Sequence, residues 1–237
     1  MLATKLRMCS FKDGPDDITG SPGSNILIAG DMTAGYFGTV SASELWTGSQ
    51  LVTAVGMLYP GNAQHDTTPW LKFALDGKIL FRPMKAFRNI ISVSELNTVG
   101  CVIGTKTVSK NGLTYKVRLM KGALTNPSLY NTLDRGAKGS EWNRLMLPIH
   151  KQAATKAWDY PANVEDDVPN WNIGFTDADL MTNREHGEGT SVLCQETTNT
   201  DSDFYVIRGG YGVSYSAKFF VTGRDRHTGW APVLELI

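Results

Sequence analysis

The sequence predicts an α+β fold that is rich in β-strands and has few, short helices. The 237 residues include 24 Gly and 10 Pro, and many short apolar runs lie between turn residues, as is typical of β-rich proteins with long ordered loops. Hydrophobic residues make up 41% and charged residues 19% of the chain, which is enough apolar material for a substantial core.

Two dipeptides predict β-hairpins in the first half of the chain. Asp76-Gly77 and Asn111-Gly112 each lie between two short runs with strand character. These dipeptides favour the backbone geometry of two-residue hairpin turns. In the second hairpin one face is apolar and the other basic, because Lys116 and Arg118 alternate with Tyr115, Val117 and Leu119.

Three helices are predicted. The clearest covers residues 140–149, where Ser140 can cap an apolar stripe formed by Trp142, Leu145, Met146 and Ile149. Pro148 is expected to kink or shorten its end. Two shorter helices are predicted over 41–48 and 92–99, because Ser41 with Glu44 has the spacing of a capping box and the pattern returns in the second segment.

Further strands are expected over 25–29, over the alternating segment 213–217, and over 233–237 after Pro232. Gly209 and Gly210 suit a turn between strands. Residues 60–69 are polar and rich in turn residues, so we expect a boundary there, with residues 1–66 and 67–237 as two parts.

The composition argues against several classes of protein. Lys plus Arg and Asp plus Glu both number 23, so nucleic acid is not an expected partner. Membrane insertion is not expected either, because no run of 18 apolar residues occurs. Cys9, Cys101 and Cys194 are too widely spaced for a zinc or thioredoxin motif, and we expect the latter two to be buried after folding in a reducing cytoplasm.

No cofactor and no metal are expected. The four histidines lack zinc-binding spacing, and neither a phosphate-binding loop nor a Gly-x-Ser-x-Gly motif is present. Calcium would need six to eight converging oxygens. We therefore interpret the acidic groups as solvated carboxylates, turns or helix caps; they are 165–167, Asp177 with Asp179, and Asp201 with Asp203.

The last hundred residues carry a family resemblance. Four motifs follow one another: a Glu-Trp helix entry at Ser140–Asn143, a Gly-to-Glu strand at 187–196, an Arg-Gly-Gly turn at Arg208–Gly210 and a Gly-Trp-x-Pro-Val strand at Gly229–Val233. In this order they resemble the C-type-lectin-like fold of formylglycine-generating-enzyme-like domains. Cys194 departs from the Trp or Val usual in that family. The reactive cysteine pair near the C-terminus is also missing, so the family's enzymatic activity is not carried over.

The wider chain is similar to phage virion proteins, through the segments 70–78, 115–119, 141–143 and 229–235. The resemblance implies a non-enzymatic virion structural protein with a lectin-like interaction module, in the tail, the neck or collar, or the head decoration. We expect assembly in the host cytoplasm, with residues 1–66 as an arm that attaches the protein to other virion proteins. The resemblance also implies a homotrimer. The alternatives are an adhesin that recognises a glycan or protein of the host surface, and an enzyme derived from the formylglycine-generating fold.

The candidate binding surface is the segment from Tyr211 to His227. It combines Ser, Gly, Tyr and Arg without a continuous apolar run, a composition that suits adaptable contacts on loops. The chosen residues are Tyr211, Tyr215, Arg224, Asp225, Arg226 and His227, with Arg184 and His186 on a neighbouring loop.

Overall fold

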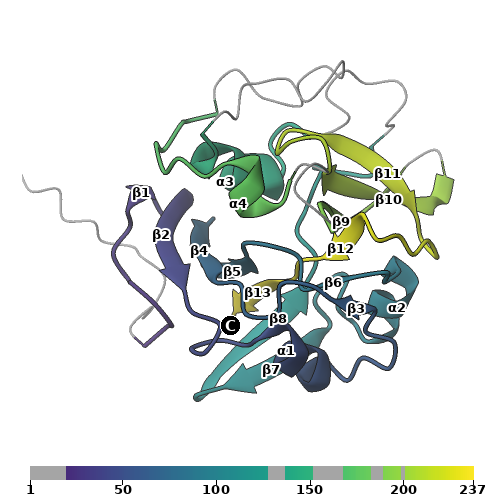
Figure 1. Ribbon diagram of the computed structural model, residues 1–237. Helices are drawn as coiled ribbons and strands as arrows, with labels where there is room; N and C mark the ends of the chain where they lie inside the picture. The colour runs from purple at the N-terminus through teal and green to yellow at the C-terminus, as the bar shows by residue number, and fades with distance from the viewer. Residues whose placement is uncertain (1–19, 128–136, 152–167, 183–188, 199–200) are drawn as a thin grey trace, which may run out of the picture.

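The larger of two β-sheets runs through the centre of the molecule (Figure 1). The computed structural model describes residues 20–127, 137–151, 168–182, 189–198 and 201–237. Seven strands form this sheet, and every neighbouring pair is antiparallel. Their spatial order is β1 (Ala29–Gly30), β2 (Ala34–Val40), β4 (Trp70–Leu75), β5 (Lys78–Pro83), β13 (Val233–Leu236), β8 (Leu113–Arg118) and β7 (Lys106–Lys110).

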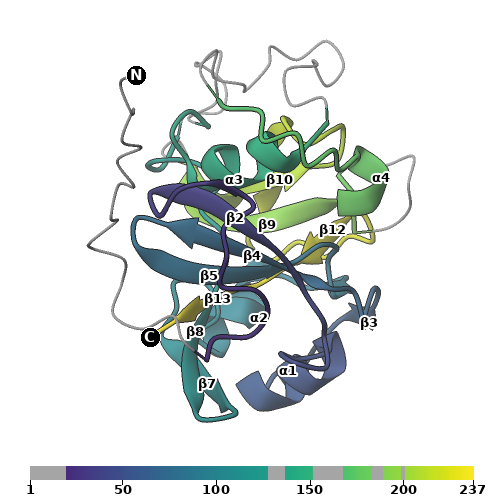
Figure 2. The same cartoon turned by 90° about the vertical axis from the view of Figure 1, so that its left-hand side faces the viewer.

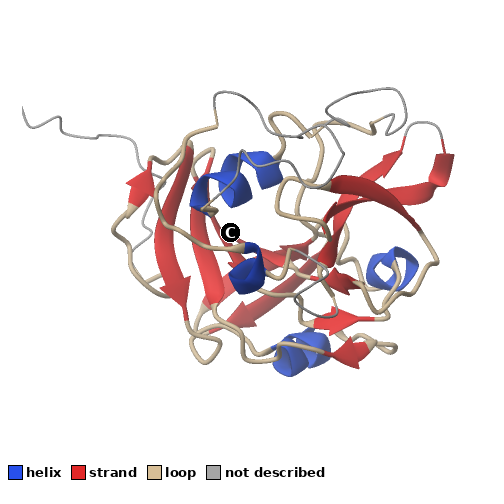
Figure 3. Ribbon diagram, turned by 45° about the horizontal axis from the view of Figure 1, so that its top comes forward, coloured by secondary structure: helices blue, strands red, loops and turns tan. Residues whose placement is uncertain are grey.

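The second sheet has six strands, and the described helices are short (Figure 3). Its order is β11 (Ser216–Phe220), β10 (Asp201–Gly209), β9 (Ser191–Thr198), β12 (Thr228–Trp230), β6 (Arg88–Asn89) and β3 (Asn62–Ala63). Among the described strands of this sheet, β9 and β12 pair in parallel and the other neighbouring pairs are antiparallel. The helices are α1 (Gly48–Val55), α2 (Val93–Thr98), α3 (Glu141–Ile149) and α4 (Asp177–Leu180). The prediction of a β-rich α+β fold with few short helices is confirmed.

Both predicted hairpins are confirmed. β4 pairs with β5 across Asp76-Gly77, and β7 pairs with β8 across Asn111-Gly112. All four turn residues have positive φ, which is the geometry that these dipeptides favour. The predicted last strand, β13, inserts between the two hairpins and pairs with β5 on one side and β8 on the other. The end of the chain therefore joins the two hairpins into one sheet.

The central strands β4 and β5 of the seven-stranded sheet are buried on both faces. On one face Phe37, Trp70 and Phe81 pack with apolar residues of α1 and α2. On the other face Leu71 and Phe73 pack with Trp142, Leu145 and Met146 of α3, which Figure 2 shows lying over β2. Strands that are buried on both sides need apolar side chains at successive positions, and this explains the run Trp70–Leu75.

Helix α3 is confirmed as predicted. The Ser140 Oγ accepts a hydrogen bond from the Asn143 N–H at 3.2 Å, which makes Ser140 the N-cap. All four residues of the stripe are fully buried. Pro148 lies in the last turn, and the helix ends at Ile149. The predicted helix over 92–99 is confirmed as α2, with Ser92 and Glu95 forming its capping box.

The strand predicted over 25–29 is wrong, because only Ala29–Gly30 pairs, as β1. The segment before β1 is held by a buried cation instead. Lys72 in β4 is fully buried, and its Nζ donates to the Asn25 Oδ1 at 2.7 Å, the Ser21 Oγ at 2.7 Å and the Ser24 carbonyl at 2.8 Å. Satisfying this ammonium group outweighs strand formation here.

The helix predicted over 41–48 is also wrong. Ser41 and Glu44 do exchange the hydrogen bonds of a capping box, but residues 42–44 form a turn. Helix α1 begins at Gly48 instead, where the Asp66 Oδ1 accepts from the Ser49 N–H at 2.6 Å and the Asp66 carbonyl accepts from the Gly48 N–H at 2.8 Å. This helix also has a local capping box, formed by Thr47 and Gln50, so a second local signal and the long-range acceptor Asp66 together mark its start.

The strand predicted over 213–217 begins only at Ser216, as β11. The residues before it form a turn, because the Gly210 and Gly212 N–H groups both donate to the Thr182 carbonyl, at 2.8 and 2.7 Å. These bonds hold the backbone away from β10 until Ser216 pairs with Arg208.

Residues 20–66 share their sheets and core with the rest of the chain. β2 lies between β1 and β4 in the seven-stranded sheet, and β3 pairs with β6 in the other sheet. Leu51 and Val55 of α1 are buried in the core that also holds Trp70 and Phe81. None of the described helices is long and apolar enough to cross a membrane.

Candidate functional site

The predicted tyrosines lie together in the turn before β11. The rings of Tyr211 and Tyr215 meet edge to face, with centroids 5.0 Å apart, and both residues are partly buried. The Tyr215 carbonyl accepts from the Gly209 N–H at 3.0 Å and from the Arg208 Nε at 3.1 Å. The tyrosine pair therefore sits on a turn that is held by hydrogen bonds to residues outside it.

The predicted charged residues form a loop between β11 and β12. Arg224 and Arg226 are exposed, whereas Asp225 and His227 are partly buried. The Arg224 Nη2 lies 2.7 Å from the Glu95 Oε1 of α2. The loop backbone is held from two sides, since the Arg226 carbonyl accepts from the Gly189 N–H at 2.7 Å and from the Asn89 Nδ2 at 2.9 Å.

The two groups lie at opposite ends of β11. Tyr215 immediately precedes this strand, and Arg224 follows it by four residues. A strand of five residues spans about 17 Å, so the tyrosine pair and the charged loop begin well apart. Arg184 and His186, predicted to lie beside them, are outside the described residues.

Residues of two motifs that carry the family resemblance, the Glu-Trp helix entry and the Arg-Gly-Gly turn, meet in a buried cluster around Trp142. The Trp142 ring is flanked by the guanidinium carbons of Arg82 and Arg208, 5.0 and 5.4 Å from its centroid. The Arg208 Nη2 donates to the Asn143 Oδ1 at 2.7 Å, and the Trp142 Nε1 donates to the Val213 carbonyl at 2.8 Å. These residues are fully buried or nearly so, and they position the chain rather than contact a ligand.

Glu196, the last residue of the Gly-to-Glu strand, is buried beside this cluster. Its Oε2 accepts from the Gly122 and Ala123 N–H groups at 2.9 and 3.3 Å. Desolvation raises the pKa of Glu196 to about 7, and repulsion from Glu141 adds to the effect, while the two backbone donors oppose it.

This carboxyl predicts a pH-dependent stability. The pKa of Glu196 is about 7 in the folded protein, against an ordinary value of 4.5. Between these values the folded state binds more protons than the unfolded state, so stability should fall as the pH rises, by up to about 1.4 kcal/mol per pH unit. Urea unfolding of the wild type and of Glu196→Gln at pH 5 and pH 7 tests this. The wild type should lose more stability than the variant, and equal losses would contradict the assignment.

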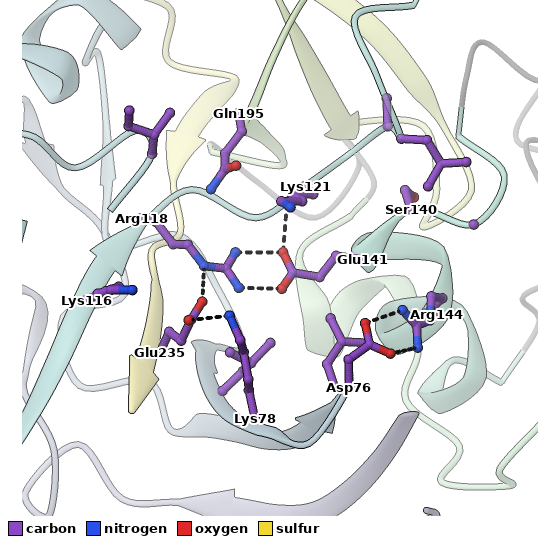
Figure 4. Close-up of a pocket in the computed structure, with 16 residues that line it drawn as sticks. Asp76, Lys78, Lys116, Arg118, Lys121, Ser140, Glu141, Arg144, Gln195 and Glu235 are labelled. Carbon is purple, nitrogen blue, oxygen red and sulfur yellow. Dashed lines mark hydrogen bonds and ion pairs between the residues drawn. The ribbon is translucent and has the colours of Figure 1, made fainter. Parts of the chain in front are cut away.

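A charged cleft lies beside the same cluster, and the sequence analysis did not identify it (Figure 4). Its volume is about 500 Å³, and it lies between the β4–β5 turn, β8, β13 and the start of α3. The strand pattern did indicate that Arg118 faces away from the apolar side. It could not indicate which acidic residues Arg118 would meet, because both come from distant parts of the chain.

Arg118 is the centre of the ion-pair network in this cleft. Its Nη1 and Nη2 donate to the two carboxylate oxygens of Glu141 at 2.8 and 2.6 Å, and its Nε donates to the Glu235 Oε2 at 3.0 Å. The Lys78 Nζ donates to the other oxygen of Glu235 at 2.7 Å. Burial alone would raise the pKa of Glu235, but the two cations outweigh it and hold this pKa below its usual value.

The rim of the cleft is more open. Asp76 and Arg144 form a bidentate ion pair there, with N–O distances of 2.6 and 2.8 Å. Lys121 is exposed and Lys116 is partly exposed. Two aliphatic side chains of the rim, Ile103 and Leu124, are both 66% exposed. Figure 4 shows the network of Arg118, Glu141 and Glu235 with the Asp76–Arg144 pair to one side.

Two of the acidic residues considered for calcium have structural roles. Asp179 accepts from the Thr176 N–H at 2.8 Å and completes the capping box of α4. The Asp177 Oδ1 accepts from the Val213 N–H at 2.9 Å and from the Thr182 hydroxyl at 2.5 Å. Both carboxylates are therefore used in local structure.

Comparisons with protein-family models, with curated proteins and with solved structures give no match to this chain.

Proposed function

We propose that this protein is a non-enzymatic structural component of a phage particle, and that its C-terminal part is a lectin-like interaction module. The observation that supports the proposal is the cluster around Trp142. Trp142, Asn143 and Arg208 meet there through a buried hydrogen bond and a ring contact. Glu196 and Arg208 also bond the backbone of the same residue, Gly122. Because the residues that carry the resemblance interact in the core, the resemblance concerns the fold of the domain. A rigid fold of this kind displays its loops for binding.

The environment of the buried cysteines agrees with a non-enzymatic role. Cys101 and Cys194 are fully buried. Desolvation raises the pKa of Cys101 to about 12 and raises the pKa of Cys194 as well. Reactive cysteines need the thiolate form, which burial in these positions disfavours.

In this proposal the N-terminal part, residues 1–66, attaches the protein to other virion proteins. Four large apolar residues in the described part of this region are exposed: Ile26, Ile28, Leu58 and Tyr59, by 61–83%. These exposed side chains are the candidate contacts for such a neighbour.

Immunogold labelling of intact particles tests the proposal. An antibody raised against this chain should label particles of the phage that encodes it, at a defined position. An array of host glycans, probed with the purified chain, separates this role from that of an adhesin. Labelled particles without glycan binding would support a structural component, and particles that carry no label would refute the proposal.

We also expect a homotrimer, since phage appendages and decorations often have threefold symmetry. The mass of one chain is 25.9 kDa, so light scattering at micromolar concentration should give about three times this value. A species of one chain mass only, at every concentration, would count against self-association.

The charged loop gives a separate prediction about the binding surface. The double variant Arg224→Ala and Arg226→Ala should change the free energy of unfolding by at most about 1 kcal/mol, because the only ion pair between described residues that it removes is exposed. It should nevertheless weaken attachment to the host or to the neighbouring virion protein. Thermal unfolding and a particle-binding assay measure the two effects. An unfolded double variant would show that these arginines are structural.

A further inference from the structure

The cleft around Arg118 has an excess of positive charge. It is lined by five cationic side chains and three carboxylates; the cations are Lys78, Lys116, Arg118, Lys121 and Arg144, and the acids are Asp76, Glu141 and Glu235. Two positive charges are therefore left over, although the chain as a whole has a formal net charge of zero. Such a local excess attracts an anionic ligand.

The two cations without a carboxylate partner lie at the rim. All three carboxylates are already paired, Glu141 and Glu235 with Arg118 and Asp76 with Arg144. Within the described part of the chain, Lys116 and Lys121 form no ion pair. A ligand carboxylate could therefore pair with either lysine without breaking the network below.

The shape of the lining distinguishes between classes of anion. Ile103 and Leu124 line the same cleft as these lysines and expose aliphatic surface. A sugar ring packs best on a flat aromatic ring, and none of the 16 described residues that line the cleft is aromatic. A peptide that carries both carboxylate and aliphatic side chains fits the lining better than an acidic glycan does.

The depth of the cleft is compatible with a peptide. A volume of about 500 Å³ lies within the range of protein ligand sites, roughly 300–1,000 Å³, and accommodates several side chains. Hydrogen bonds from Arg118 to Glu141 and Glu235 already fix the side chains at the floor of the cleft. Binding a ligand therefore costs little side-chain entropy there.

We propose that this cleft binds an acidic peptide segment in which carboxylate and aliphatic side chains alternate, presented by a neighbouring protein. The peptide carboxylates pair with Lys116 and Lys121, and its aliphatic side chains pack on Ile103 and Leu124. The inference rests on the proposed function only for the source of the peptide, a second protein of the particle. Binding itself can be measured without a particle.

Fluorescence anisotropy with the full chain and a labelled peptide of alternating Glu and Leu tests this site. The wild type should bind it, and the same peptide with Gln in place of Glu should bind much more weakly. The variant Lys116→Ala/Lys121→Ala should weaken binding of the Glu peptide roughly tenfold, as expected for the loss of two exposed ion pairs. The matched control Lys85→Ala/Lys151→Ala removes the same charge outside the cleft and should bind like the wild type.

A second variant tests the apolar rim. Leu124→Asp replaces an exposed aliphatic side chain by a negative charge and should weaken binding at least as much, while the melting temperature confirms that the variant is folded. Three results would overturn the proposal. The wild type could fail to bind the Glu peptide, or the two double-lysine variants could lose the same amount of affinity for it. The third is that Lys116 and Lys121 are needed for binding polygalacturonate, an acidic glycan, but not for binding the peptide. None of them bears on the immunogold result, so this inference and the proposed function can fail separately.

Discussion

Replacing Trp142 by Ala is expected to lower the free energy of unfolding by about 3–5 kcal/mol, the usual cost of truncating a large core aromatic residue. The side chain is fully buried, shares the core cluster on one face of the sheet with Leu71 and Phe73, and lies between the guanidinium groups of Arg82 and Arg208. Truncation would leave a cavity, and it would also remove the donor to the Val213 carbonyl.

Denaturant unfolding of two further variants separates these contributions. Trp142→Phe keeps most of the ring volume and removes the Nε1 donor, so its loss should be smaller than that of Trp142→Ala. Leu58→Ala shortens a side chain that is 83% exposed and should change stability by less than about 0.5 kcal/mol. A loss below about 1 kcal/mol for Trp142→Ala would mean that the core around this ring can collapse into the space.

The second large effect is expected at Arg118. Arg118→Met should cost about 3–5 kcal/mol, because it leaves the buried Glu141 carboxylate without its cation. The side chain of Glu141 is only 2% exposed, so water cannot replace the lost partner. The remaining donor to this carboxylate in the described structure is the Lys121 N–H, at 2.8 Å.

The ion pair of Arg144 with Asp76 is the matched control, because it is also bidentate and lines the same cleft. Its side chains are 29% and 59% exposed, so Arg144→Met should cost no more than about 1 kcal/mol. The double variant Arg118→Met/Glu141→Met should recover part of the loss, since no buried charge is then left unpaired. Urea unfolding measures all three, and equal costs at Arg118 and Arg144 would contradict the burial argument.

Elements with local signals were predictable from the sequence. The turns at Asp76-Gly77 and Asn111-Gly112 need positive φ, which these residues adopt readily, so each dipeptide determines its own hairpin. Helix α3 combines an N-cap with a stripe at helical spacing, and α2 carries both halves of its capping box. In each case the interacting residues lie within a few positions of one another.

The same local chemistry failed where other partners competed with it. Ser41 and Glu44 form the expected hydrogen bonds, yet the helix begins at Gly48. There a second capping box, Thr47 with Gln50, and the distant Asp66 provide the acceptors for its first N–H groups. Asn25 was expected in a strand, but its side chain is needed by the buried ammonium group of Lys72, 47 positions away. Burying a charge costs more than a few strand hydrogen bonds contribute, so the long-range contact prevails.

The sequence by itself determined the β-rich class, both hairpins, two of the helices and the final strand. Only the tertiary structure decided that β13 lies between the two hairpins, and therefore that Glu235 meets Arg118 from one side while Glu141 meets it from the other. Arg118 and Glu235 are 117 positions apart. No local sequence pattern encodes the contact between these two residues, because it depends on how strands from the whole chain pair. The charged cleft therefore forms only when the sheet has formed.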